Sequence, residues 1–282
     1  MIYKSPFNYI GNKHRMIACL QDIFPQNINT FVDMFCGGGD VLINTDAEVK
    51  IANDVNYHVI DVLQTFQNLS IETILDHIDR RIAEWNLSKT NSEAFRQFRQ
   101  HYNENPNPLD LYVLVCYSFN YQFRFNSRHQ YNNPFGKNRS CFSNRMRENL
   151  ISFVRLIRNV RFTKNDFRAI DLTGLQPGDF IYADPPYTLT CGSYNDGKRG
   201  FSGWSAADDM ALLSILDRLN DSGISFGLSN VIEHKGKRHP FLSDWAQEKG
   251  YTIHYPNINY NNCNYQSNNK QYRTVEVVIT NY

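Results

Sequence analysis

The chain lacks the features that mark several large classes of protein. Among its 282 residues no run approaches 18 apolar residues, so we expect no membrane-spanning helix. Its first residues contain no apolar core typical of a secretory signal peptide. The six cysteines show neither a C-x-x-C pair nor a zinc-like spacing to histidine, which indicates reduced thiols in a cytosol. The eight histidines form no pattern of nucleophile and base, and we expect no metal site.

Net charge is nearly absent as well, but the charges are unevenly distributed. The chain carries 29 Lys and Arg against 28 Asp and Glu, a formal charge of +1. Residues 121–168 contain eleven basic and two acidic residues, so this segment is +9 and the rest of the chain must be −8. A basic segment on an otherwise acidic chain indicates a partner with a phosphate backbone. The alternative is a solvated charged face.

The pattern of apolar residues predicts an α/β fold. A hydrophobic content of 41% is ample for a buried core, and strand-like segments alternate with helical ones, which favours a mostly parallel sheet. The candidate strands are 31–35, 48–52, 159–163, 180–183, 224–229, 251–255 and 274–280. From 57 to 157 helical signals dominate over a length too great for a loop. We therefore expect one α/β domain, residues 1–56 and 158–282, interrupted by a helical subdomain, residues 57–157.

The most informative motif is Asp184-Pro185-Pro186-Tyr187, which directly follows an apolar run. Proline lacks a backbone N–H and has a fixed φ, so a strand must stop here. The Asp184 carboxylate and the prolyl carbonyls then become acceptors at the strand's carboxyl end, beside the ring of Tyr187. Such a pocket suits a planar ring with an exocyclic amino group. Taken alone, the motif also fits an ordinary strand end with a proline turn.

A glycine turn is the second signal. Cys36-Gly37-Gly38-Gly39-Asp40 follows the first candidate strand, and glycines at such a turn permit positive φ and let a ligand approach the backbone. The next candidate strand ends at Asn53-Asp54, where an acidic side chain commonly binds ribose hydroxyls. The turn is not a G-x-G-x-x-G fingerprint, and no phosphate-loop Lys-Ser/Thr follows it. It therefore favours a nucleoside-containing ligand, with no phosphate implied.

Residues 119–137 form a third distinct segment, in which aromatic residues alternate with Asn, Gln and Arg before a closing Pro134-Phe135-Gly136 turn. This alternation fits an ordinary hairpin with one solvated face. It also fits recognition of DNA, where Asn, Gln and Arg meet base edges and aromatic rings fill the space left in an opened duplex.

The motifs and their order resemble the Dam-type DNA adenine-N6 methyltransferases, the phage-type enzymes among them. The resemblance covers nearly the whole chain. The matching segments are Tyr9-Ile10-Gly11-Asn12-Lys13, Phe31-Val32-Asp33-Met34-Phe35-Cys36-Gly37-Gly38, Ala52-Asn53-Asp54, Asn133-Pro134-Phe135-Gly136-Lys137, Asp166-Phe167, Asp184-Pro185-Pro186-Tyr187 and Phe226-Gly227-Leu228-Ser229-Asn230. The resemblance implies a Rossmann-like, mixed but mostly parallel seven-stranded sheet that binds S-adenosylmethionine. The helical insert would be a DNA target-recognition domain carrying a β-hairpin.

The resemblance also implies a reaction and a setting. A methyl group would pass from S-adenosylmethionine to adenine N6 in double-stranded DNA, with GATC as the expected site, in the cytoplasm of a bacterial cell or a phage-infected host. N6 is a poor nucleophile because its lone pair is delocalised, so acceptors for both its N–H bonds and an in-line approach to the methyl group are required. The base must flip out of the duplex to reach them.

Individual roles follow from the resemblance in the same way. Catalysis is expected at Asp184, Pro185, Pro186 and Tyr187. Cofactor contacts are expected at Tyr9, Lys13, Phe35, Gly37, Gly39, Asp54, Asp166, Phe167 and Asp184. DNA contacts are expected at Asn120, Phe123, Arg124, Asn126, Arg128, Pro134, Lys137 and Arg139. Within these sets Lys13 would pair with the methionine carboxylate and Arg124 would read a guanine. By their position in the basic run after the Pro-Phe-Gly turn, Arg139, Arg145 and Arg147 are candidates for phosphate contacts. Asn8 departs from the family, which often has a lysine there, so the outer-base specificity is not implied.

Other interpretations stay open. An adenine-N6 enzyme could act on a different DNA site or on RNA. Cytosine-N4 enzymes usually carry serine in place of Asp184, and glutamine methyltransferases of release factors usually begin the motif with asparagine. From another class, the chain could be a nucleic-acid-binding module whose catalytic site is silent, although the intact Asp184, Tyr187, Asp54 and Lys13 disfavour this. We expect a monomer or a weak dimer on DNA, with or without a partner restriction enzyme.

Overall fold

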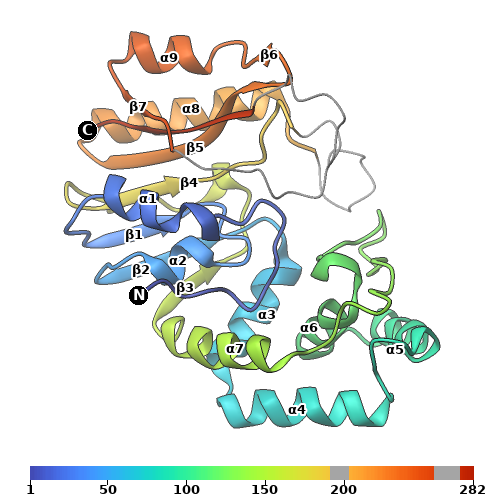
Figure 1. Cartoon of the computed structure of the whole chain (residues 1–282). Helices are drawn as coiled ribbons and strands as arrows, with labels where there is room; N and C mark the ends of the chain where they lie inside the picture. The colour runs from blue at the N-terminus through green and yellow to red at the C-terminus, as the bar shows by residue number, and fades with distance from the viewer. Residues whose placement is uncertain (191–202, 257–273) are drawn as a thin grey trace.

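A computed structural model describes residues 1–190, 203–256 and 274–282. Its centre is an eight-stranded sheet in the order β3–β2–β1–β4–β5–β8–β7, with β6 paired to β5 (Figure 1). The strands are β1 (Thr30–Asp33), β2 (Val49–Asn53), β3 (Val160–Thr163), β4 (Phe180–Ala183), β5 (Ser225–His234), β6 (Lys237–Arg238), β7 (Thr252–His254) and β8 (Thr274–Thr280). The first five are parallel to one another, whereas β6, β7 and β8 pair antiparallel. The predicted mixed, mostly parallel sheet is confirmed.

All seven predicted strands form, with small differences at their ends. β6 was not predicted, because a two-residue strand has no pattern of its own. β5 continues to His234, beyond the predicted end at 229, because its last residues pair with β8 and β6. β1 stops at Asp33, since Met34 and Phe35 already turn toward the glycines.

Alternation along the strands gives the sheet two apolar faces. Phe31 and Phe180 belong to one buried cluster and Val32 and Ile181 to the other, because successive side chains of a strand point to opposite faces. The first face is covered by α1 (Ile17–Ile23), α2 (Asp40–Asn44) and α3 (Tyr57–Asn68). The second is covered by α8 (Ala206–Asp221) and α9 (Leu242–Glu248). The result is a three-layer α/β arrangement.

The start of α8 illustrates how local sequence sets an element boundary. The helix begins with a capping box: the Ser205 hydroxyl accepts the Asp208 N–H, and the Asp208 carboxylate accepts the Ser205 N–H. This capping box satisfies donors that the first turn of a helix leaves without partners. The described residues also contain three short 3-10 helices, η1 (His14–Met16), η2 (Phe119–Tyr121) and η3 (Phe167–Ala169).

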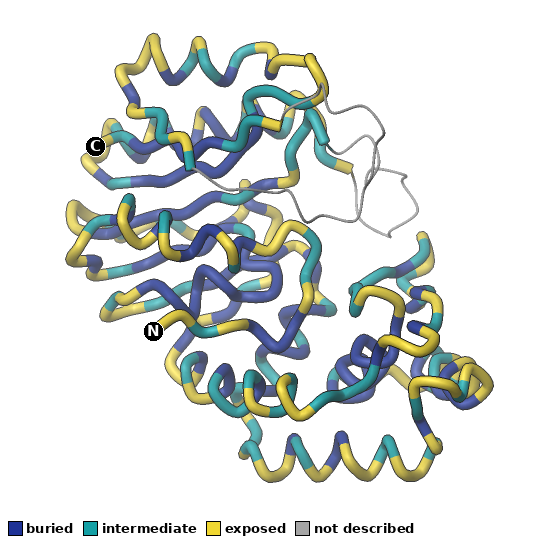
Figure 2. Tube along the Cα trace, in the orientation of Figure 1, coloured by how far each residue is buried: buried dark blue, intermediate teal, exposed yellow. Residues whose placement is uncertain are grey.

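Residues 57–157 contain no named strand and are mainly helical, as predicted (Figure 1). After α3, the helices are α4 (Ile71–Glu84), α5 (Ser92–Glu104), α6 (Pro108–Tyr117) and α7 (Asn144–Leu156). Figure 2 shows α6 almost wholly buried, whereas α4 alternates between buried and exposed positions. An apolar helix of this kind is the core of a small bundle. Asp110 of α6 is buried and accepts hydrogen bonds from His77 and Arg81 of α4, which joins the two helices.

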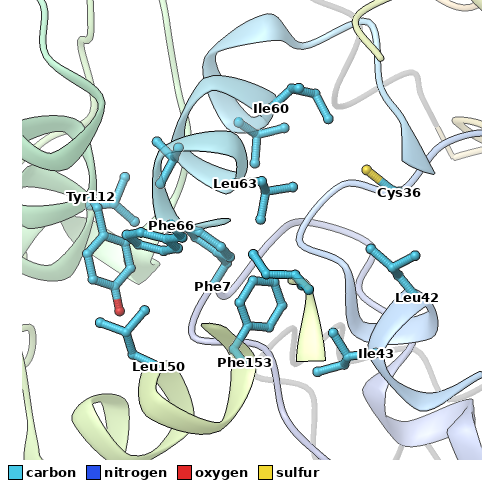
Figure 3. Close-up of a cluster of buried hydrophobic side chains, with 14 of the residues drawn as sticks. Phe7, Cys36, Leu42, Ile43, Ile60, Leu63, Phe66, Tyr112, Leu150 and Phe153 are labelled. Atoms are coloured by element: carbon cyan, nitrogen blue, oxygen red, sulfur yellow. The ribbon is translucent and has the colours of Figure 1, made fainter. Parts of the chain in front are cut away.

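The insert shares its core with the sheet domain. Figure 3 shows Phe7 from the N-terminal segment between Phe66 of α3 and Phe153 of α7, with Tyr112 of α6 nearby. Ring centroids in this group lie 5.1–5.9 Å apart. The apolar cluster is therefore continuous from the first face of the sheet into the insert, and the division at 56/57 and 157/158 stays a prediction about domains.

The predicted hairpin within residues 119–137, called loop 119–137 below, is only partly formed. The chain folds back on itself through isolated antiparallel bridges, Ser118 with Phe135 and Phe125 with Tyr131, but no strand develops. Positive φ angles at Asn120, Tyr121 and His129 interrupt the extended backbone that a strand needs. The expected β-hairpin is thus replaced by an irregular fold-back.

The predictions of reduced thiols and of no membrane-spanning helix can be examined only in the described residues. Cys19, Cys36, Cys116 and Cys141 are free thiols, while Cys191 and Cys263 lie outside the described residues. None of the helices in the described ranges combines the length and apolar character needed to cross a membrane.

Candidate active site

Three of the sequence motifs meet at the carboxyl edge of the sheet. β1 lies between β2 and β4, and all three are parallel, so the segments that follow them leave from the same edge. These segments are the glycine turn after β1, Asp54 after β2 and Asp184 after β4. The strand order reverses between β1 and β4, and open α/β sheets bind ligands at such a switch point.

The glycine turn and Asp54 form one hydrogen-bonded unit. Gly37 N–H donates to Asp54 Oδ2 at 2.9 Å, and Asn56 N–H donates to Oδ1 at 2.8 Å. Burial raises the pKa of Asp54 to about 6, even though the Asn56 and Gly37 amides act to lower it. The carboxylate is thereby held at the turn, with lone pairs left to accept from hydroxyl groups of a ligand.

The N-terminal segment closes over this unit. A Cβ on Gly37, whose φ is +46°, would lie 2.8 Å from Tyr9 Cδ1, so a side chain at this position would collide with the Tyr9 ring. Asn56 Nδ2 also donates to the Tyr9 hydroxyl at 3.2 Å. The structure therefore places Tyr9, Gly37 and Asp54 together, as the sequence suggested.

An aromatic cluster lies beside the turn. The Phe35 ring is 5.6 Å from the rings of both Phe167 and Trp204, which are 5.2 Å from each other. The indole N–H of Trp204 donates to the buried Asp209 at 2.7 Å. Three rings from separate segments thus gather at a site suited to a planar heterocycle.

Asp166 has a different environment from its neighbour Phe167. Its carboxylate accepts the Arg168 N–H as the N-cap of η3 and pairs with the Arg168 guanidinium at 3.1 Å. Its side chain is 49% exposed. The ring of Phe167 therefore faces the aromatic cluster, while the carboxylate of Asp166 is directed to its own turn and to Arg168.

The motif after β4 lies in a network of buried charges. Lys13 Nζ is 2.7 Å from Asp184 Oδ2 and 3.6 Å from Glu276 Oε1. The Tyr187 hydroxyl lies 2.9 Å from Asp184 Oδ1 and 2.9 Å from Glu276 Oε1, and Lys13 Nζ is 5.0 Å from the centre of the Tyr187 ring. Both oxygens of Asp184 thus have partners in this structure. Of the two prolines, Pro185 is buried and Pro186 exposed.

Electrostatics at this edge are dominated by carboxylates. Burial raises the pKa of Asp184, while Lys13 counteracts this and Glu276 reinforces it. Burial, together with the charges of Asp184 and Asp54, raises the pKa of Asp33 well above its usual range. Such a site attracts groups that carry hydrogen-bond donors or positive charge.

The predicted DNA contacts in loop 119–137 and just after it differ in how far their side chains are exposed. Exposed side chains belong to Asn120, Arg128, Pro134, Lys137 and Arg139, and Arg124 is half-buried. Phe123 instead packs inward, with its ring 5.3 Å from Phe7 and 6.0 Å from Tyr9.

Asn126 holds the tip of the loop together. Its Oδ1 accepts the N–H groups of Arg128 and Gln130 at 2.9 and 3.0 Å, and its Nδ2 donates to the Gln130 side chain. The structure therefore gives Asn126 a role in shaping the turn, and a contact with a base would have to compete with these bonds.

Fewer basic side chains of residues 121–168 are available for phosphate contacts than the charge of this segment suggested. Arg147 pairs with Asp79, Lys164 with Asp61, and Arg168 with Asp166 and Asp208. The guanidinium of Arg158 donates to the Gln67 and Leu69 carbonyls. Several basic residues of this segment thus already have partners within the protein, and Arg147 in particular is a weaker candidate for a phosphate contact than Arg139.

Three residues of the carboxyl edge were given no role by the sequence analysis: Asp33, although it lies in a matching segment, Trp204 and Glu276. Glu276 stands between Val275 and Val277 in β8, and a lone carboxylate within an apolar strand was a usable signal. Trp204 immediately precedes the capping box of α8 and could have been tested as a wall of the pocket. Among the described residues, no group of three or more His, Cys, Asp or Glu is arranged to hold a metal ion.

Comparison with known proteins assigns this constellation to a family. Residues 9–262 match the model described as D12 class N6 adenine-specific DNA methyltransferase, which is most of the chain. Methyltransferases with this Rossmann-like fold use S-adenosylmethionine.

Individual relatives are similar over different shares of their own length. Modification methylase StsI of Streptococcus sanguinis is 50% identical and Type II methyltransferase M.FokI of Planomicrobium okeanokoites is 46% identical, each over 99% of this chain and 43% of the relative. DNA adenine methylase of Escherichia coli K12 is 24% identical over 79% of this chain and 78% of the relative. The chain thus spans less than half the length of the first two relatives.

Proposed function

Because the chain belongs to the D12 class of N6 adenine-specific DNA methyltransferases, we propose that it transfers a methyl group from S-adenosylmethionine to adenine N6 in duplex DNA. The observation that carries the proposal is the convergence of Asp184 with the glycine turn and Asp54 at the switch point of the sheet. A binding module without catalysis gives no reason to bury Asp33 and Asp54 and to place Asp184 beside them, since buried carboxylates are costly.

The residues at this edge fit the methyl donor. S-adenosylmethionine supplies a methyl group on a positively charged sulfonium. The Asp54 carboxylate would accept the ribose hydroxyls, while Phe35 and Phe167 would hold the adenine ring together with Trp204. Tyr9, Gly37 and Gly39 would line the turn, and Lys13 would bind the methionine carboxylate. Asp166 would act at the edge of the cofactor site, by capping the short helix η3 that carries Phe167.

Catalysis is proposed to depend on acceptors for the adenine amino group. Asp184 and the Pro185 carbonyl would accept the two N–H bonds of N6, which directs its lone pair toward the methyl carbon. The C–N bond forms as the S–C bond breaks, and N6 then loses a proton to solvent by way of Asp184. Pro186 keeps the turn rigid, and Tyr187 would stack on the base, which must flip out of the duplex to arrive.

Product analysis tests the proposal directly. The protein is incubated with duplex DNA and methyl-labelled S-adenosylmethionine, and the nucleosides are separated by mass. We expect label in N6-methyladenine. Label in N4-methylcytosine, label in RNA alone, or no transfer would each contradict the proposed function.

The recognition sequence is proposed on weaker grounds. The Dam resemblance makes GATC the first sequence to test, with Arg124 as the reader of a guanine and Asn120, Phe123, Asn126, Arg128, Pro134, Lys137 and Arg139 as further contacts. The greater identity to two modification methylases favours a second candidate, a different site used alongside a restriction enzyme. Sequencing with modification detection on plasmid DNA treated with the protein distinguishes the two candidate sites. Methylated adenines that lie only at sequences other than GATC would exclude GATC.

The setting follows from the substrate. We propose a cytoplasmic protein that acts as a monomer or as a weak dimer on DNA. Sedimentation with and without a duplex of the methylated sequence measures this, and a stable dimer without DNA would contradict it.

A further inference from the structure

We propose that Glu276 is a positioning residue that takes over Lys13 and Tyr187 when Asp184 turns to the adenine amino group. The inference rests on the proposed function and concerns a residue that none of the sequence motifs contains. Its basis is the ion pair of Asp184 with Lys13, which weakens Asp184 as an acceptor for the adenine amino group.

Each carboxylate oxygen of Asp184 already has a partner in this structure. Its Oδ2 is 2.7 Å from the ammonium of Lys13, and its Oδ1 accepts the Tyr187 hydroxyl at 2.9 Å. Each oxygen keeps a further lone pair, but a carboxylate whose charge is neutralised by an ammonium is a weaker acceptor. Asp184 therefore accepts the N–H of adenine N6 more strongly when it loosens its contact with Lys13.

Both partners already have a second carboxylate within reach. Glu276 Oε1 is 2.9 Å from the Tyr187 hydroxyl oxygen and 3.6 Å from Lys13 Nζ. The Tyr187 hydroxyl has one proton for two carboxylate oxygens, so it can pass from Asp184 to Glu276 by rotation of the O–H alone. Lys13 needs to shorten its distance to Glu276 by less than 1 Å to make a hydrogen bond of ordinary length.

Burial makes the second carboxylate necessary. The side chains of Lys13, Asp184 and Glu276 are 6%, 16% and 11% exposed, so water is a poor substitute partner. A buried ammonium that loses its counter-ion is costly. Glu276 keeps Lys13 and the Tyr187 hydroxyl satisfied in both states, which lowers the free energy required to release Asp184.

The position of Glu276 suits this role. It lies in β8, which pairs with β5 on one side and β7 on the other, so its backbone is held by the sheet. Lys13 precedes η1, and Asp184 and Tyr187 lie in the turn after β4. The exchange thus occurs between side chains of two turns and a fixed strand.

Substitution of the carboxylate tests the exchange. In Glu276→Gln the side chain keeps its size but loses its charge, and Lys13 stays on Asp184. We expect kcat to fall by about ten- to a hundredfold, the range that loss of one charged hydrogen bond in the transition state produces. The Kd for S-adenosylmethionine, measured by calorimetry, should change by less than about threefold, because Lys13, the proposed partner of the methionine carboxylate, is retained and Glu276 lies 3.6 Å from it.

The pH profile separates this role from a merely structural one. Within the described residues, the charged and titratable groups that face Asp184 are Lys13, Tyr187, Glu276, Asp33 and Tyr182. Because the charge of Glu276 raises the pKa of Asp184, its removal should move the acid limb of kcat/KM to lower pH. Glu276→Asp, which keeps the charge, should recover part of kcat and leave the acid limb near that of the wild type.

Controls distinguish the possible failures. Glu248→Gln makes the same change at an exposed position on α9 and should leave kcat and the pH profile unaltered. An unchanged kcat in Glu276→Gln, or a lower kcat with an unmoved acid limb, overturns the exchange while the proposed function stands. A wild-type protein that methylates no DNA overturns the proposed function, and the exchange with it.

Discussion

The carboxyl edge of the sheet and loop 119–137 are constructed in contrasting ways. At the edge, parallel strands hold Asp54 on the amides of Gly37 and Asn56 and Asp184 against Lys13, beside the buried Asp33. The loop is held by isolated bridges, positive-φ residues and side-chain bonds to its own backbone, and most of its candidate DNA contacts are exposed. Chemistry that depends on sub-ångström placement suits the first kind of structure, while contact with a duplex suits the second.

The two regions meet at Phe123 and Tyr9. Phe123 belongs to the loop and packs against Tyr9, whose ring lies on the glycine turn. Asn8 Nδ2 donates to the Asn120 carbonyl at 3.1 Å, which ties the N-terminal segment to the loop a second time. The two regions are therefore in contact but are held by different kinds of bonds. We expect substitutions at the edge to change rate and cofactor affinity, and substitutions in the loop to change the binding of DNA.

The largest effect is expected at the edge. Asp184→Ala should lower the single-turnover methylation rate by about a thousandfold, because an acceptor that acts in the transition state is lost. Affinity for S-adenosylmethionine and for DNA should largely survive. Single-turnover kinetics with titrations of both ligands measure this, and a rate close to that of the wild type would show that Asp184 is not the acceptor.

A smaller effect, on cofactor affinity and its pH dependence, is expected at Asp54. Asp54→Asn should weaken binding of S-adenosylmethionine about ten- to a hundredfold, since hydroxyl donors prefer a charged acceptor. Burial raises the pKa of Asp54 to about 6, so the free protein protonates this group as the pH falls through 6. Wild-type affinity should therefore decline below pH 6, while that of Asp54→Asn should stay level. Calorimetry from pH 5 to 8 would contradict this if both proteins gave parallel curves.

In loop 119–137, Arg124→Ala should alter specificity more than rate. A bidentate arginine–guanine pair is worth about 1–3 kcal/mol of discrimination, so preference at one base pair should relax by about ten- to a hundredfold. Methylation rates on a panel of singly altered sites provide the measurement, with Arg124→Lys as the control that keeps the charge but loses the planar fork. A uniform fall across the panel would indicate that Arg124 holds only the backbone.

The smallest effect is expected at two exposed residues, Lys137 at the end of the loop and Arg139 just beyond it. Alanine at either position should weaken binding to all sequences alike and reduce the salt slope of log K by about one unit. Arg147→Ala is the matched control, because Arg147 already pairs with Asp79 and should leave the slope unaltered. Equal salt slopes for all three variants would show that Lys137 and Arg139 contribute no more to phosphate binding than Arg147, which is paired with Asp79.

Much of the fold and of the edge could be predicted from the sequence. The strands, the capping box of α8 and the turns at Gly37 and Asp184 depend on local chemistry: alternation, the missing Cβ of glycine and the missing N–H of proline. The irregular form of loop 119–137 escaped prediction, because alternation of residue types does not report the positive φ angles that break a strand.

The sequence by itself determined where the elements lie and which three motifs would share the carboxyl edge, since parallel strands leave one edge together. Only the tertiary structure decided which charges face each other. Lys13 and Asp184 pair across the fold with Glu276 beside them, and Arg147 pairs with Asp79 on the surface. Such pairs form between residues far apart in the chain, and their energy depends on distance and burial, which no local pattern contains.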